Sequence, residues 1–262
     1  MTQLALIPFL FIAFAIAWGI IALYIFFSEP MIQTFGALSG EHPLFYLAVY
    51  APAIAAIVVV LYSAGRSGLR RFLARLLMWR SSFGWYALLI IGIPLVFYAA
   101  AAVQGQRLTD PFPFASVPAY LVAAFLMAIK GPVEEIGWRG LALPLLQRRF
   151  SPIWAGLILG IIWGIWHLPA FLLSGTPQSA WSFTPFVIGA VAISVIVTPL
   201  FNKSRGSILL PALFHFQLIN PLWPDAQPYD TYLFVGMAVL VVWSNRKSMF
   251  GRDGAVTEVA PK

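Results

Sequence analysis

The sequence predicts an all-α fold: a polytopic bundle of about eight transmembrane helices with both termini cytoplasmic. Of the 262 residues, 61% are hydrophobic and only 10% are charged, whereas soluble domains carry roughly 25% charged residues. The mean hydropathy is +0.87. The apolar residues also gather in runs of about 20, the helix length that crosses a bilayer core of about 30 Å. This composition excludes a disordered chain, a coiled coil and a nucleic-acid-binding protein.

The apolar runs set the expected spans. In chain order they cover residues 4–27, 44–62, 83–104, 117–146, 153–173, 183–201, 207–220 and 231–244. The first run has no Lys or Arg before it, so we expect a retained helix and not a cleaved signal peptide. The last run is short for an untilted crossing. Without a repeat, we expect one membrane domain with three regions, namely N-terminal helices at 1–116, a core at 117–221, and a last helix and tail at 222–262.

Charge predicts the orientation, because Lys and Arg concentrate in cytoplasmic connections. Thirteen of the 16 basic residues fall in one set of alternate connections and the tail: Arg66, Arg70, Arg71, Arg75, Arg80, Arg148, Arg149, Lys203, Arg205, Arg246, Lys247, Arg252 and Lys262. The other set holds one basic residue and most of the acids: Arg107, Glu29, Glu41, Asp110, Asp225 and Asp230. The net charge of +7 therefore indicates a cytoplasmic leaflet and not a polyanionic partner.

The arginine-rich connection 63–82 carries an apolar stripe of Leu69, Phe72, Leu73, Leu76, Leu77 and Trp79. This pattern fits an amphipathic helix lying in the membrane interface. A solvated loop is the alternative that the sequence leaves open.

The two remaining basic residues flank two acids inside the fourth span: Lys130, Glu134, Glu135 and Arg139. A charge at the bilayer centre costs roughly 2.5–3.5 kcal/mol on insertion scales, so such residues face the bundle interior and mark a site. The structural alternative is two ion pairs, each spaced four residues apart, that hold helices together.

Two histidines favour a catalytic site over this structural alternative. His167 lies deep in the fifth span and His215 in the seventh, and two imidazoles with two carboxylates are the components of a water-activating site. Counting about 1.5 Å per residue from the predicted cytoplasmic ends places them in the cytoplasmic half of the membrane. The chain has no Cys, so it lacks a thiol nucleophile, and no span carries a serine- or aspartyl-protease motif.

The segments GPVEEIGWRG at 131–140, WGIWHLP at 163–169 and SILLPALFHFQLIN at 207–220 resemble the CAAX-processing and bacteriocin-processing intramembrane proteases, the Abi family. The pattern of that family is Glu-Glu-x-x-x-Arg, Phe-x-x-x-His and His-x-x-x-Asn on successive spans. Here Trp163 stands where Phe is usual, and Asn220 comes one position late. Because Asn220 precedes Pro221, we expect the helix to fray there and the amide to turn toward the site.

The resemblance implies peptide-bond hydrolysis at the cytoplasmic face, with Glu134 as general base beside His167. His215 and Asn220 would stabilise the oxyanion, and Glu135 with Arg139 would form an orienting pair. An apolar bundle leaves a carboxylate poorly solvated, which makes it a better proton acceptor. The cofactor stays open: zinc on His167, His215 and Glu134, or no metal. Lys130 would pair with Glu134 unless Pro132 kinks the helix.

The expected partners are a peptide or protein substrate presented at the membrane and the lipid bilayer, with no nucleic acid. The expected location is multi-pass in a bacterial cell membrane. Two other functions remain open, a non-catalytic immunity or regulatory module on the same scaffold and a proton-coupled transporter, since Glu and His also form proton relays.

Overall fold

The computed structural model describes residues 2–106 and 112–261, and within them every regular element is helical. The expected connection residues Arg107 and Asp110 lie outside this part. Six helices are long and apolar enough to cross a membrane, and two shorter apolar helices, Leu209–Leu218 and Tyr229–Ser244, follow them. These six and two correspond to the eight apolar runs of the sequence, and the predicted all-α membrane fold is confirmed.

The α-helices in chain order are α1 Leu6–Phe26, α2 Ser28–Phe35, α3 Pro43–Ala74, α4 Phe83–Ala87, α5 Ile93–Gln104, α6 Val117–Lys130, α7 Glu134–Gly137, α8 Leu143–Gln147, α9 Pro152–Trp166, α10 Phe183–Lys203, α11 Leu209–Leu218, α12 Tyr229–Ser244 and α13 Arg246–Phe250. Short 3-10 or π turns join several of them. Those that matter for the site are η4 Gly131–Val133 and η5 Trp138–Ala142.

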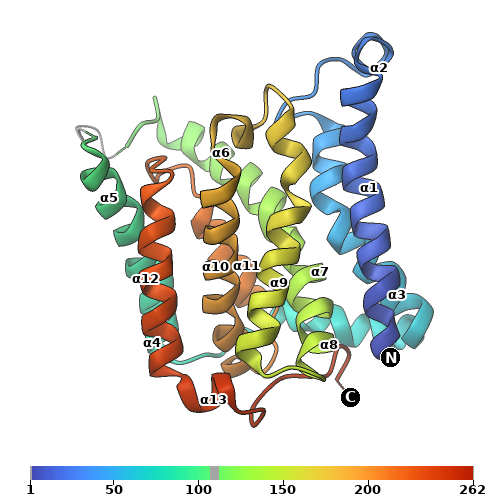
Figure 1. Cartoon of the computed structure of the whole chain (residues 1–262), viewed down its shortest axis with the longest axis vertical. Coiled ribbons are helices and arrows are strands. Elements are labelled where there is room, and N and C mark those ends of the chain that lie inside the picture. Colours follow the sequence, from blue (N-terminus) through green and yellow to red (C-terminus); the bar gives the residue numbers. More distant parts are fainter. Residues whose placement is uncertain (1, 107–111, 262) are drawn as a thin grey trace.

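The long helices stand side by side as a bundle (Figure 1). α1 packs on α3, while α10 packs between α9 and α12, which in turn contacts α5. Both termini lie at the lower end of Figure 1, and α2 marks the upper end. We call these the terminal end and the α2 end. The two termini therefore share one side, as the alternation of charged connections requires, while the assignment of that side to the cytoplasm remains a prediction.

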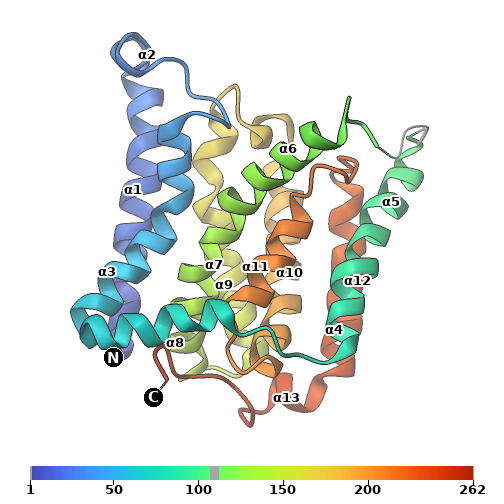
Figure 2. The ribbon, with the colours of Figure 1, turned by 180° about the vertical axis from the view of Figure 1, so that it is seen from behind.

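The arginine-rich connection is helical, as one of the two sequence readings proposed. α3 breaks at Gly65, whose positive φ of 64° permits a sharp turn. The helix beyond the break crosses the terminal end of the bundle (Figure 2). Its Phe72 is fully buried against the core, whereas Leu77 and Trp79 are exposed, so the predicted apolar stripe is divided between the bundle and its surroundings.

Arg75, at the end of this crossing segment, closes the terminal end. The side chain is 2% exposed. Its Nε donates to the carbonyl of Gly206 at 2.7 Å, and its Nη1 donates to the carbonyls of Gly140 and Val259, each at 2.8 Å. One guanidinium thus ties the C-terminal tail to η5 and to the connection between α10 and α11. Charge-assisted bonds of this kind are among the stronger ones in proteins.

The fourth span departs from ideal helical geometry at two places. The backbone leaves helical geometry at Lys130, where ψ is −82°, and η4 carries Pro132. A π turn, η5, follows α7, and such turns occur often at functional sites. The predicted kink is therefore present, and it separates Lys130 from the carboxylates that follow.

Close backbone packing fixes α7 in place. A Cβ added at Gly137 would lie 2.5 Å from the carbonyl oxygen of Pro52 in α3. The obstacle is backbone of a packed helix, which cannot yield as the end of a flexible side chain would. A glycine is required here so that the carboxylate-bearing turn can approach α3.

We expect Gly137→Ala to lower the free energy of unfolding by about 1–3 kcal/mol, the usual cost of overpacking a core. Thermal unfolding in detergent measures the change. Gly236→Ala is the matched control, because nothing lies within 4 Å of its added Cβ and alanine favours a helix over glycine. Equal melting temperatures for the two variants would contradict this packing.

Candidate active site

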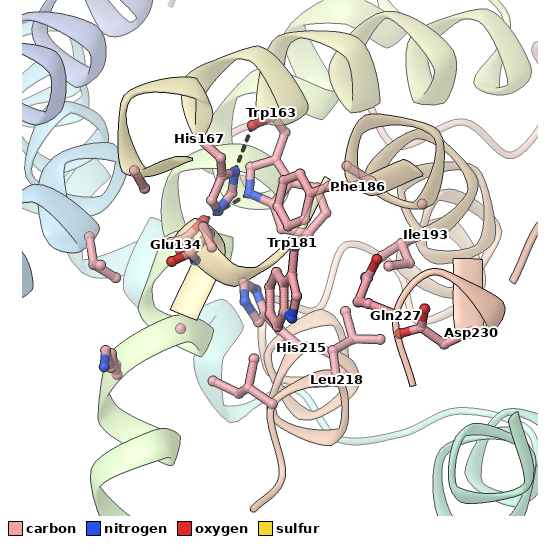
Figure 3. Close-up of a pocket in the computed structure, with 18 of the residues that line it drawn as sticks. Glu134, Trp163, His167, Trp181, Phe186, Ile193, His215, Leu218, Gln227 and Asp230 are labelled. Carbon is pink, nitrogen blue, oxygen red and sulfur yellow. Dashed lines mark hydrogen bonds between the residues drawn. The ribbon is translucent and has the colours of Figure 1, made fainter. Parts of the chain in front are cut away.

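The functional residues meet at a cavity of about 380 Å³ inside the bundle, within the size range of small-molecule sites. Of the six residues predicted from sequence, four line it: Glu134, His167, His215 and Asn220. The other two, Glu135 and Arg139, are buried beside it. Figure 3 shows side chains from several helices directed into this space. The structure thus brings Glu134 and the two imidazoles to one cavity and places Glu135 beside it.

Trp163 organises this group. Its indole Nε1 donates to Glu134 Oε2 at 2.8 Å. The ring centroid lies 5.4 Å from that of His167 and 5.6 Å from that of His215, both edge-on. The guanidinium of Arg139 lies 4.9 Å from the same centroid, in cation–π range. One indole therefore orients the acid and contacts both imidazoles (Figure 3).

His167 ends α9 and turns one nitrogen back to its own helix. Nδ1 lies 2.8 Å from the carbonyl oxygen of Trp163. A carbonyl only accepts, so Nδ1 must carry the hydrogen in this bond. In the neutral ring, Nε2 is then an acceptor on the side that faces the cavity lining. This arrangement fixes the tautomer of His167.

Glu135 binds two basic side chains through one oxygen. Its Oε1 accepts from Arg139 Nη1 at 2.9 Å and from His215 Nδ1 at 2.9 Å. The carboxylate and the guanidinium are 2% and 1% exposed. The predicted pair of Glu135 and Arg139 thus exists, and it also orients His215. Arg139 Nε and Nη2 and Glu135 Oε2 make no further hydrogen bond within the described residues.

Lys130 does not pair with Glu134, one of the arrangements that the four-residue spacing allowed. Its Nζ bonds Glu41 Oε1 at 3.2 Å and lies 5.4 Å and 5.3 Å from the ring centroids of Phe45 and Tyr46. The kink at η4 is the reason, because it turns Lys130 toward the connection before α3. Glu134 therefore has no basic side chain within ion-pairing distance among the described residues.

Asn220 lies beyond the end of α11, which stops at Leu218, so the fraying expected before Pro221 occurs. The side chain lines the cavity. Its amide donates to Gln217 Oε1 at 3.0 Å, and its Oδ1 accepts from the backbone of Leu222 at 3.0 Å. Asn220 reaches the site, but no hydrogen bond joins it to His215 among the described residues.

The donor set does not fit the zinc centre that the sequence left open. Across the described residues, no three side chains among His, Asp and Glu come together as metal ligands. Nδ1 of His215 is already bonded to Glu135 Oε1, and Nδ1 of His167 is bonded to the carbonyl oxygen of Trp163. We therefore derive no step through a metal.

The cavity lies toward the α2 end. Its lining includes Ala170, Gln178 and Trp181 from the connection after α9, and Trp223 and Gln227 from the connection before α12. Both connections lie at the end away from the termini (Figure 1). The sequence predicted a site in the cytoplasmic half and cytoplasmic basic connections. The two expectations cannot both hold in this structure, because the cavity lies near the connections that carry few basic residues. Counting residues along each span gave a depth for each side chain but did not show which connections cover the cavity.

Sequence reasoning missed two further lining residues. Trp163 was noted only as an aromatic in place of Phe, and its indole N–H was the available signal. Asp230 was assigned to an outer connection, yet it lies in the first turn of α12, is 6% exposed and lines the cavity. Its adjacency to the start of an apolar run was the only sign of burial.

Two comparisons with known proteins agree with the resemblance. Residues 113–218 match the family model of type II CAAX prenyl endopeptidases, described as Rce1-like. The match begins before α6 and ends with α11, and so contains all the predicted site residues except Asn220. The expected resemblance to CAAX-processing proteases is confirmed over this segment.

The chain is also 27% identical over 180 residues to the CAAX prenyl protease 2 of Methanococcus maripaludis strain S2. The aligned part covers 64% of this chain and 65% of that protein, so the chain spans just under two thirds of the length of this relative. Together with the six apolar helices, these similarities support an integral membrane protein. Its bacterial location remains a prediction.

We expect Glu135→Gln to lower the free energy of unfolding by about 3–5 kcal/mol, because it leaves Arg139 as a buried charge without a carboxylate. Thermal unfolding in detergent measures the loss. The matched control is Glu29→Gln, an exposed acid in the first turn of α2, which should cost no more than about 1 kcal/mol. Similar losses in both variants would contradict the role given to Glu135.

Proposed function

We propose that this chain is a membrane-embedded endopeptidase that hydrolyses a peptide bond with a water activated by Glu134 and His167. The observation that carries the proposal is that these two side chains, from different helices, are held by the same Trp163 and line one cavity. The cavity volume of about 380 Å³ could hold on the order of ten waters. The matches to CAAX prenyl proteases support the same reaction class.

In this mechanism Glu134 is the general base. Its Oε2 is engaged by the indole of Trp163, which leaves Oε1 to accept a proton from water. His167 presents Nε2 as an acceptor, because its Nδ1 is bound to the carbonyl of Trp163. A water between the two would be oriented by two acceptors, with a lone pair directed at the peptide carbonyl. General bases in such positions contribute typically about 10²–10⁴-fold to the rate.

His215 is proposed as the oxyanion donor. This role requires the form of His215 in which both ring nitrogens carry a hydrogen. The bond from His215 Nδ1 to Glu135 would then leave Nε2–H as a donor, close to the backbone of Gly131, where an added Cβ would lie 2.8 Å from it. Asn220 would serve as a second donor if its amide exchanged Gln217 for the substrate. Donors of this type are worth about 2.7–4 kcal/mol.

The side of the membrane from which substrate reaches the cavity is inferred from the charged connections and from the position of the cavity. Every basic connection residue within residues 2–106 and 112–261 belongs to the set assigned to the terminal end. The positive-inside tendency makes that end cytoplasmic. The connections that roof the cavity lie at the other end. We therefore propose access from the non-cytoplasmic side, in place of the cytoplasmic face that the sequence suggested.

The two other candidate functions differ in what they need. A transporter requires a polar path across the bundle, whereas the terminal end is closed by Arg75 and its three carbonyl partners. A non-catalytic module on the same scaffold needs no turnover. The engagement of Asn220 with Gln217 is the one feature that favours the module.

Glu134→Gln should abolish peptide cleavage, with a loss of at least about 10²-fold, because an amide cannot take the proton of water. Cleavage of membrane-presented peptides by the purified protein, read by mass spectrometry, measures it. Glutamine can still accept from Trp163, so the melting temperature should stay close to that of the wild type. Equal cleavage by both proteins would overturn the proposal, and a partner that binds both without being cleaved would favour the module.

Cysteine labelling tests the proposed side of access, since the chain has no Cys of its own. We expect Ser174→Cys, in the connection after α9, to react with a membrane-impermeant maleimide in intact cells of a bacterial host. Lys247→Cys, in α13 at the terminal end, should react only after the membrane is opened. Both positions are exposed. The opposite labelling pattern would show that the cavity faces the cytoplasmic side.

A further inference from the structure

The cavity has a second polar region that the proposed mechanism does not use. Asp230 is 6% exposed and lines the cavity, and Asp225 lines it at an exposed position. Figure 3 shows Asp230 beside Gln227, on the side of the pocket away from Glu134. Within the described residues, no Lys, Arg or His lies within ion-pairing distance of either aspartate. We call these two residues with Gln178 and Gln227 the acidic region.

A buried carboxylate without a cation is costly. Asp230 receives one hydrogen bond at its Oδ1, from the backbone of Thr231 at 2.7 Å, and that bond does not balance the charge. Asp225 Oδ2 accepts from Trp181 Nε1 at 2.9 Å, which holds this indole over the cavity. Neither partner is charged, so within residues 2–106 and 112–261 no cation neutralises the acidic region.

Two hydrogen-bond acceptors that lack a partner also indicate a ligand. Gln178 Oε1 and Gln227 Oε1 are buried oxygens without a hydrogen-bond partner in the described structure, and both residues line the cavity. One buried donor, the Nε1 of Trp223, is also unpartnered there. Because buried polar atoms are almost always satisfied, these atoms indicate a ligand rich in donors that also carries a carbonyl, as a basic residue of a peptide does.

The walls between the acidic region and Glu134 suit the rest of such a ligand. Trp181, Phe186 and Phe234 line the same cavity, and Trp181 and Phe186 stack with their planes 20° apart. Aromatic and aliphatic surfaces accommodate the methylene stem of Lys or Arg while the charged end reaches a carboxylate. Aromatic faces also attract cations.

From these observations we propose that the acidic region binds a cationic group of the peptide substrate, namely a Lys or Arg side chain or a free amino terminus. Cleavage would then be selective for bonds at a fixed distance from that group. This inference rests on the proposed peptidase function for its consequence in cleavage, but the binding itself requires no turnover.

The test measures peptide binding to the Glu134→Gln protein in nanodiscs. This variant is used because it should not cleave the probe. The probes are acetyl-Phe-Phe-Arg amide and the isosteric acetyl-Phe-Phe-citrulline amide, which lacks the charge. A third probe, Phe-Phe-citrulline amide with a free amino terminus, separates an amine from a side chain. We expect at least one cationic probe to bind ten-fold or more tightly than the neutral one, as measured by thermophoresis.

Adding Asp230→Asn should bring that ratio close to one, because asparagine keeps the acceptor for Thr231 and loses the charge. The matched control Glu29→Gln, an acid of α2 outside the cavity lining, should leave the ratio unchanged. If the Asp230 variant does not yield folded protein, Asp225→Asn should lower the ratio at least three-fold.

Equal binding of charged and neutral probes, no binding of any probe, or a preference that survives both aspartate substitutions would overturn the inference. The peptidase proposal fails on a different result, namely equal cleavage by wild type and Glu134→Gln. The two failures are therefore distinguishable.

Discussion

The arrangement of the site depends on the cost of placing charge inside an apolar bundle. Glu135 meets this constraint by binding two basic side chains through a single oxygen, since Arg139 and His215 each lie 2.9 Å from its Oε1. An isolated ion in such surroundings would be penalised by several kcal/mol even after relaxation. The pairing holds α7, η5 and α11 in one register. It also leaves Glu134, the neighbouring residue, directed into the cavity and without an ion-pair partner in the part of the chain that the structure describes.

The kink in the fourth span allows Glu134 and Glu135 to have different partners. In an uninterrupted helix, residues 130 and 134 would share a face, and Lys130 would compete for Glu134. The non-helical ψ at Lys130 and the 3-10 turn at Pro132 send the ammonium to Glu41 instead. The close approach of Gly137 to Pro52 then anchors the turn that carries both carboxylates. Backbone irregularity inside a membrane is tolerated where protein surrounds it, as it does here.

Charge is separated along the bundle axis as well as within the site. The basic connections and the two termini share one end, where Arg75 fastens three carbonyls, while the acids Glu41, Asp225 and Asp230 belong to connections or helix starts near the other (Figure 1). Two of these acids, Asp225 and Asp230, line the cavity. An acidic approach to a buried carboxylate disfavours anionic substrates and favours cationic ones.

The sequence by itself determined the membrane class, the approximate spans and the residues that meet at the site. Hydrophobic run length and the cost of intramembrane charge are local or compositional quantities, and the motifs at Glu134, His167 and His215 are read directly. Tertiary structure alone decided the partners: Lys130 with Glu41, His215 with Glu135, and Trp163 with Glu134. It also decided the end at which the cavity opens and the burial of Asp230. These depend on kinks, π turns and helix contacts between residues far apart in the chain, which no periodicity in the sequence encodes.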